Sequence, residues 1–136
     1  THDSSLSTCI FSIAASKLGF PEKAYDYFGD SAMLDLYNTH GNTKDGIHTA
    51  NMGGVWMAIV YGFAGLRIRE SGLSFNPRLP GQWRACRFRI AYRDSRVQVE
   101  MTKTGTSFTL LEGTKKAIRV YGKPYTLKST LRVEGE

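Results

Sequence analysis

The chain has few cysteines and no long uninterrupted apolar run, and each shortage excludes a class of protein. Two cysteines among 136 residues are too few for a disulfide framework. Cys9 and Cys86 both fall in periodic apolar segments, which indicates buried free thiols, a reducing compartment and hence a cytoplasmic protein. The longest apolar stretch, residues 55–68, contains Arg67 and two glycines. Because a membrane span needs about 18 to 20 apolar residues, we expect no membrane partner.

The sequence also lacks the short motifs of several enzyme classes. It contains no P-loop, no dinucleotide-binding glycine fingerprint and no nucleophile elbow. Its three histidines have no Glu or Asp at ligand spacing, so we expect no metal site. We interpret His2 and His40 as surface or structural residues. No pair of carboxylates for glycoside chemistry can be placed in a polar pocket.

The remaining composition is sufficient for a packed protein. Apolar residues make up 41% of the chain and charged residues 22%, which excludes a disordered or collagen-like chain and fits one domain or slightly more. The first residue is Thr1, without an initiator Met or a signal segment. We therefore expect a fragment of a longer protein.

The net charge of +6 raises the question of a nucleic-acid partner. Arginines are concentrated between residues 67 and 89, close to several aromatic residues. However, Arg87 and Arg89 alternate with the apolar Phe88 and Ile90, as in any strand with one buried and one solvated face. No RNA-binding signature, zinc finger or recognition helix accompanies them. We therefore expect a solvated sheet face and no nucleic-acid partner.

The first half of the chain predicts helices. Apolar residues three and four apart predict an amphipathic helix over residues 5–18, capped within residues 3–5 and ending at Gly19. Pro21 predicts the first turn of a second helix, which extends to about Leu36. The short connection between the two helices predicts an antiparallel hairpin.

A third helix is predicted from the most apolar stretch of the chain. Residues 38–45 are turn formers and predict a loop before it. Residues 55–64 are apolar on every side, which predicts a helix that starts near Gly54 and is buried all round. Two short neighbours cannot cover such a helix. We therefore expect an interior helix of a larger helical assembly.

From Leu66 onward the apolar period changes to two residues, which predicts strands. The predicted strands are residues 66–69, 73–75, 84–92, 96–102, 107–111, 117–121, 125–128 and 130–133. Turn residues separate them at short, regular intervals. This spacing is typical of an antiparallel β-sandwich.

The segment 46–54 is a candidate anion site. Its glycines bracket His48, Thr49 and Asn51 just before the apolar helix. Backbone amides at a helix start favour an anion, a histidine can donate to phosphate and a threonine adds a hydroxyl. A tight turn with Asn51 as a simple N-cap explains the same residues equally well. The hydroxyls of Ser4 and Ser5 mark a second helix start, where an ordinary cap is the simpler interpretation.

Four segments carry a resemblance to a known family: THDSSLS (1–7), GIHTANMGG (46–54), GFAGLR (62–67) and LSFNPRLP (73–80). In residue identity and in order along the chain, these segments resemble motifs of glycoside hydrolase family 65. Its members include disaccharide phosphorylases acting on maltose, trehalose, kojibiose and related α-glucosides. The resemblance covers residue 1 to about residue 101, and the later residues resemble the variable last strands of the same family. The wording Thr-Ala-Asn-Met after His48 is most similar to the members that act on maltose.

The resemblance implies a mixed α and β architecture. Residues 1–68 would be the last helices of an (α/α)6 catalytic barrel, and residues 69–136 would form a C-terminal antiparallel β-sandwich. The parent protein would be a bacterial homodimer. The family's general acid lies upstream of Thr1, so the resemblance implies no catalytic residue in this chain and no activity of the chain alone.

The resemblance also implies the reaction. In inverting phosphorolysis an acid protonates the glycosidic oxygen while inorganic phosphate attacks the anomeric carbon, so that maltose gives β-glucose 1-phosphate and glucose. Phosphate is then a co-substrate, and no cofactor is needed. The phosphate-binding residues implied here are Ser4, Ser5, His48 and Thr49, where the two helix starts would meet.

Other functions are open at this point. The parent could be a trehalose- or kojibiose-type phosphorylase, or a hydrolase of the same family, whose water would replace phosphate. A different class is a non-catalytic sandwich in which Trp83 and Tyr92 grip a glycan or an acidic polymer. Against that class, Tyr92 shares a predicted strand face with Cys86, which favours a core position.

Overall fold

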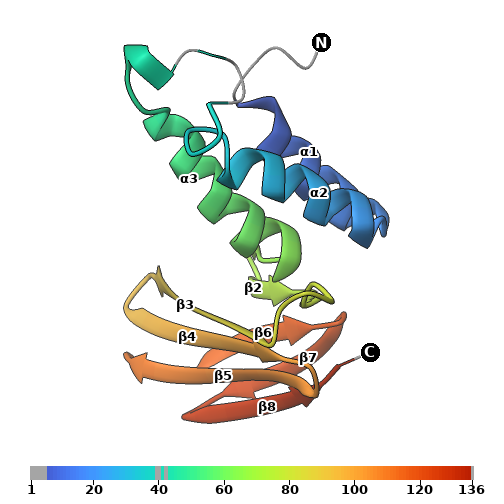
Figure 1. Cartoon of the computed structure of the whole chain (residues 1–136). Coiled ribbons are helices and arrows are strands. Elements are labelled where there is room, and N and C mark those ends of the chain that lie inside the picture. Colours follow the sequence, from blue (N-terminus) through green and yellow to red (C-terminus); the bar gives the residue numbers. More distant parts are fainter. Residues whose placement is uncertain (1–5, 39–40, 42, 136) are drawn as a thin grey trace. The chain divides into compact units, whose positions relative to one another are not determined.

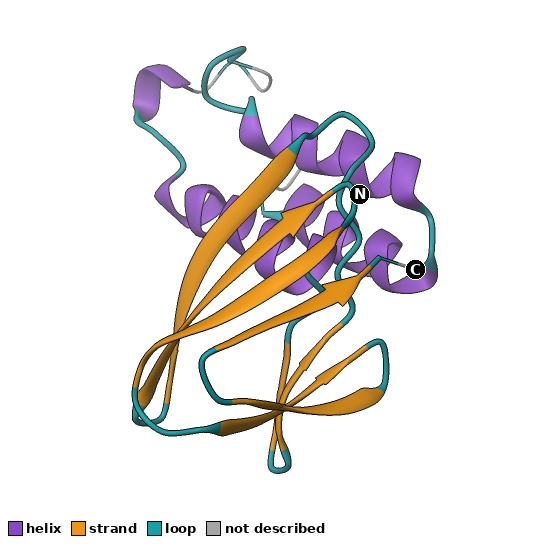
Figure 2. Ribbon diagram, turned by 90° about the horizontal axis from the view of Figure 1, so that it is seen from below, coloured by secondary structure: helices purple, strands orange, loops and turns teal. Residues whose placement is uncertain are grey.

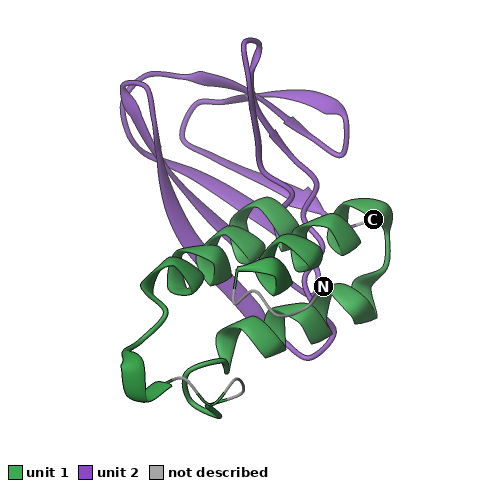
Figure 3. Cartoon of the chain, turned by 90° about the horizontal axis from the view of Figure 1, so that it is seen from above, with its two compact units in different colours: residues 1–63 green, residues 64–136 purple. Residues whose placement is uncertain are grey.

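The chain is represented by a computed structural model that describes residues 6–38, 41 and 43–135. It divides into two compact units, Thr1–Phe63 and Ala64–Glu136, which Figure 3 colours separately. The described helices lie in the first unit and the described strands lie in the second (Figure 1). Within the described ranges, no helix is long and apolar enough to cross a membrane.

Helices α1 (Ser7–Leu18) and α2 (Pro21–Ala32) confirm two of the predicted elements. Gly19 ends α1 with a φ of 80°, a left-handed conformation that glycine adopts without a Cβ clash. Pro21 occupies the first turn of α2, where its missing N–H costs nothing. The predicted end of α2 at Leu36 is wrong, because the chain leaves the helix after Ala32 and turns.

The pairing of α1 with α2 confirms the antiparallel hairpin. The hydroxyl of Ser12 donates to the carbonyl of Ala24 over 2.8 Å, and both residues are buried. The ring centroids of Phe11 and Tyr27 lie 5.5 Å apart. An earlier residue of α1 therefore meets a later residue of α2, as antiparallel packing requires. The predicted capping residues 3–5 lie outside the described residues.

Helix α3 (Thr49–Met57) continues into a π-helical turn, η2 (Ala58–Phe63). The prediction of a start near Gly54 is wrong, because the helix already begins at Thr49. The prediction of burial all round is also wrong for this chain. Trp56 is 46% exposed and Met57 is 38% exposed, since α1 and α2 cover only one side of α3.

The described residues of the first unit expose many large apolar side chains, at relative exposures from 38% to 76%. They are Leu6, Ile10, Leu18, Phe20, Leu36, Tyr37, Ile47, Met52, Trp56 and Met57. Five of them lie on α1 and α3, and exposed apolar surface gathered in this way marks an interaction surface. Helices α1 and α3 therefore carry apolar surface that the described residues of this unit leave uncovered.

Close backbone packing joins α3 to α1. A Cβ atom at Gly54 would lie 2.4 Å from the Sγ atom of Cys9, so only a glycine fits at this position without movement. Cys9 is a buried free thiol, as predicted, and Cys86 is a half-buried free thiol. The neighbouring Gly53 has no atom within 4 Å of a Cβ built on it.

The second unit contains two four-stranded sheets, seen as two groups of arrows in Figure 2. The strands are β1 (Arg67–Arg69), β2 (Gly72–Phe75), β3 (Ala85–Tyr92), β4 (Ser95–Thr102), β5 (Gly105–Glu112), β6 (Lys116–Val120), β7 (Lys123–Leu127) and β8 (Thr130–Glu134). The sheet orders are β1-β2-β6-β7 and β3-β4-β5-β8. Every predicted strand is confirmed, with ends shifted by at most two residues.

The prediction of a wholly antiparallel sandwich is wrong at one pair, because β2 and β6 run parallel, with Leu73 opposite Ile118. Parallel neighbours need a long connection, and the strands β3, β4 and β5 of the other sheet supply it. The rings of Phe75 and Phe108 join the two sheets, with centroids 4.9 Å apart. Both rings are buried, so the core of this unit lies between its sheets.

The arginine-rich strand β3 has the solvated face that its alternation predicts. Arg87 Nη2 donates to Glu100 Oε1 over 2.7 Å, and Arg89 Nε donates to Gln98 Oε1 over 3.1 Å. Both bonds are exposed and join β3 to β4. On the other face, Ile90 is buried. The arginines therefore pair with neighbouring side chains across the sheet.

Candidate anion-binding site

The start of α3 is shaped by the residues just before the helix. The N–H groups of Asn51 and Met52 donate to the carbonyl of His48, and the N–H of Thr49 donates to the carbonyl of Ile47. These amides are therefore engaged, and the predicted row of free amides is not what the helix start offers. The His48 side chain is 19% exposed and Thr49 is exposed. An anion at this place would meet an imidazole and a hydroxyl first.

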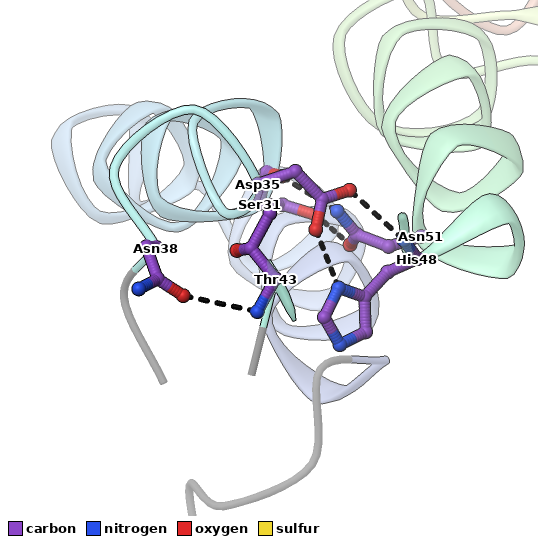
Figure 4. A network of polar contacts seen from close by, with 6 residues as sticks. All are labelled: Ser31, Asp35, Asn38, Thr43, His48 and Asn51. Atoms are coloured by element: carbon purple, nitrogen blue, oxygen red, sulfur yellow. Dashed lines mark hydrogen bonds and ion pairs between the residues drawn. The ribbon is translucent and has the colours of Figure 1, made fainter. Parts of the chain in front are cut away.

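Asp35 holds His48 at two points, as the dashed lines in Figure 4 show. The backbone N–H of His48 donates to Asp35 Oδ2 over 2.9 Å, and His48 Nδ1 lies 2.5 Å from Asp35 Oδ1. The two side chains are 19% and 15% exposed, so both are largely shielded from water. The two bonds from His48 hold the pKa of the Asp35 carboxyl below its ordinary value.

This contact fixes which ring nitrogen of His48 is left for a ligand. An ionised carboxylate can only accept hydrogen bonds, so Nδ1 of His48 carries the proton. Nε2 then accepts a hydrogen bond when the ring is neutral and donates one when the ring is an imidazolium. In Figure 4 the second ring nitrogen of His48 points away from Asp35.

A buried amide–hydroxyl pair joins the end of α2 to α3. Ser31 Oγ donates to Asn51 Oδ1 over 2.6 Å, and Asn51 Nδ2 donates to the carbonyl of Ser31 over 2.7 Å. Asn51 is 3% exposed and lies inside α3, so the interpretation of Asn51 as a simple N-cap is wrong. Its amide instead fixes the position of α3 beside the turn that carries Asp35.

The structure thus places part of the predicted site and adds two residues to it. His48 and Thr49 stand together at the start of α3, while Ser4 and Ser5 lie outside the described residues, as do His2 and His40. Asp35 and Ser31 were missed by the sequence analysis. No local spacing could reveal them, because Asp35 precedes His48 by 13 residues and meets it only through the packing of α2 against α3.

The aromatic residues considered for glycan binding do not form an exposed platform. Tyr92 is 9% exposed and belongs to the core of its sheet, and Trp83 is half-buried. A glycan-binding face needs accessible ring surfaces, so this pair gives no support to the module alternative. Within the ranges that the structure describes, no group of three His, Cys, Asp or Glu side chains could hold a metal ion.

The chain is similar to known proteins along nearly its whole length. It is 59% identical to an α,α-trehalose phosphorylase of Geobacillus stearothermophilus and 38% identical to a maltose phosphorylase of Bacillus subtilis (strain 168). Each alignment covers 93% of this chain and 17% of the relative, so the chain spans about a sixth of the length of these relatives. The higher identity to the trehalose enzyme leaves the maltose specificity unconfirmed.

A solved structure has the same fold. It is named as a candidate kojibiose phosphorylase from the human microbiome and superposes with a TM-score of 0.93 at 36% identity. The match covers 99% of this chain and 20% of the solved chain. Residues 1–57 match the glycosyl hydrolase family 65 central catalytic domain, and residues 66–127 match the C-terminal domain of the same family. With two successive domains matched in order, the chain belongs to glycosyl hydrolase family 65, as its sequence motifs predicted.

Proposed function

We propose that the chain is part of an inverting phosphorylase of α-glucosyl disaccharides, to which it contributes phosphate-binding residues. The observation that carries the proposal is His48 at the start of α3, fixed by Asp35 and leaving Nε2 for an anion. The relatives named as phosphorylases support the reaction class. Thr49, Ser4 and Ser5 are proposed to add their hydroxyls to the same phosphate.

The proposed reaction needs few groups from this chain. An oxygen of inorganic phosphate attacks the anomeric carbon, the bond from that carbon to the glycosidic oxygen breaks, and an acid protonates the leaving oxygen. Attack from the opposite face converts the α-glucoside into β-glucose 1-phosphate. Phosphate is already a nucleophile, so no carboxylate base is needed to activate water. We place the general acid outside this chain.

The helical unit fits a position inside a larger helical domain. Its exposed apolar side chains on α1, α3 and the segments beside the helices need cover, and further helices of an (α/α)6 barrel would provide it. In this proposal residues 1–68 belong to the barrel and residues 69–136 to the C-terminal sandwich. The parent protein is proposed to be a cytoplasmic bacterial homodimer that uses no cofactor beyond its co-substrate, phosphate.

Three disaccharides are candidate substrates of the parent protein. Trehalose is the first candidate, because the chain is similar to an α,α-trehalose phosphorylase. Maltose comes second, because the wording after His48 and the similarity to a maltose phosphorylase both support it. Kojibiose is the third candidate, supported by the similarity of the solved structure.

The full-length protein should form β-glucose 1-phosphate from one of these three disaccharides only when inorganic phosphate is present. The assay quantifies β-glucose 1-phosphate and free glucose in parallel reactions with and without phosphate. One molecule of each product per disaccharide supports phosphorolysis. Two molecules of glucose formed without phosphate would identify a hydrolase and reject the proposal. The 136-residue chain, assayed alone, should form neither product, because it lacks the proposed acid.

A further inference from the structure

The two bonds between Asp35 and His48 restrain more than the ring. The backbone bond to Oδ2 fixes the main chain of His48 at the residue before α3, and the ring bond to Oδ1 fixes the plane of the imidazole. One carboxylate thus restrains both the main chain and the side chain of His48. A side chain held in its binding rotamer loses less conformational freedom when a ligand arrives.

The turn that carries Asp35 is itself held on both sides. Before it, the buried pair of Ser31 and Asn51 joins the end of α2 to α3. After it, the N–H of Thr43 donates to Asn38 Oδ1 over 3.0 Å. Figure 4 shows these contacts around the carboxylate. Asp35 therefore sits on a braced segment, which is what a residue needs if it is to orient another side chain.

The negative charge of Asp35 has a role that an amide could not fill. A carboxylate on Nδ1 stabilises the imidazolium form of a histidine, as in the serine hydrolase triad, and an anion at Nε2 favours the same form. His48 can donate to a phosphate oxygen from Nε2 only in that form, because Nδ1 is engaged with Asp35. Removing the charge would therefore weaken the donor without removing the ring.

We propose that Asp35 is a positioning residue for inorganic phosphate, which presents Nε2 of His48 to the anion by holding its ring N–H and its backbone N–H. This inference rests on the proposed function and adds a residue that never touches the phosphate itself. Removing the carboxylate partner of a metal-ligating histidine typically lowers affinity or activity by about 10- to 100-fold, and we expect the lower end of that range for a histidine that binds an anion.

The test is Asp35→Asn in the full-length protein, with steady-state kinetics in both phosphate and disaccharide. We expect kcat/KM for phosphate to fall by about 10-fold, while KM for the disaccharide changes by less than about twofold. In a His48→Ala background, Asp35→Asn should cause no further loss, because the residue that it positions is gone. If Asp35→Asn does not fold, Asp35→Glu tests the positioning role instead, because it keeps the charge but displaces it by one methylene from both His48 contacts. In that variant too, kcat/KM for phosphate should fall while KM for the disaccharide changes by less than about twofold.

Ser12→Ala is the matched structural control. It removes the buried hydrogen bond from Ser12 to the carbonyl of Ala24 and leaves the turn that carries Asp35 unchanged, so it should lower thermal stability but leave kcat/KM for phosphate within about twofold. Equal effects of Ser12→Ala and Asp35→Asn on kcat/KM for phosphate would overturn the inference. If kcat/KM for phosphate fell selectively in His48→Ala but not in Asp35→Asn, the inference about Asp35 would be overturned while the proposed function would stand. If the reaction rate of the wild-type protein did not depend on the phosphate concentration, both the proposed function and this inference would be overturned.

Discussion

Replacing His48 with alanine in the full-length protein should lower kcat/KM for phosphate by about 10- to 100-fold, because one hydrogen bond to a charged group contributes about 1.5–3 kcal/mol. The KM for the disaccharide should change by less than about twofold, since the proposed contact of His48 is with phosphate alone. Initial rates over a grid of both substrate concentrations measure the two values. His48→Gln keeps a neutral donor and should lose less than His48→Ala.

An equal loss in phosphate and disaccharide use would contradict this expectation. It would mean that His48 supports the folding of α3 through its bonds to Asp35 and binds no phosphate. A melting temperature recorded for each variant shows whether stability changed as well. His48→Ala with wild-type stability and a selective loss for phosphate is the pattern that the proposed site predicts.

Gly54→Ala should lower the free energy of unfolding by about 1–3 kcal/mol, which is the usual cost of forcing extra atoms into a packed site. The added Cβ would lie 2.4 Å from Cys9 Sγ, so α3 must move away from α1 or Cys9 must shift. Urea unfolding of the 136-residue chain, followed by far-ultraviolet circular dichroism, measures the change. Adding Cys9→Ala should recover part of the loss, because it removes the sulfur.

Gly53→Ala is the control for that variant, because it makes the same chemical change one residue away. Nothing lies within 4 Å of a Cβ at Gly53, and Gly53 is exposed within the helix. Alanine there should raise the free energy of unfolding by about 0.5–1 kcal/mol through its better helix propensity. If both variants shift stability in the same direction, the close contact between Gly54 and Cys9 is not what fixes α3 against α1.

The parts of the fold that the sequence predicted are those set by local pattern. Gly19 and Pro21 mark the turn between α1 and α2, and strict alternation of apolar residues marks the strands. The parallel pairing of β2 with β6 was not predicted, because strand direction depends on how distant segments meet. The early start of α3 was missed because the side chain of Asn51 hydrogen-bonds to Ser31 and does not cap the helix. That contact has no sequence signature.

The candidate site divides in the same way. His48 and Thr49 could be selected from glycine spacing and residue type, and both stand at the start of α3. Asp35 could not be selected, because an aspartate in a turn-forming stretch has many ordinary explanations. Its role depends on where α2 ends, and that end was predicted four residues too late. The missed residue and the missed helix boundary therefore have one cause.

The central claim is that phosphate binds at His48, and the most direct test is a crystal structure of the full-length protein with inorganic phosphate. We predict a phosphate oxygen within about 2.7–3.2 Å of His48 Nε2, with Asp35 still on Nδ1. The hydroxyl of Thr49 and those of Ser4 and Ser5 should lie on the same anion. Phosphate bound elsewhere in an active protein, with Nε2 of His48 contacting water alone, would contradict the account.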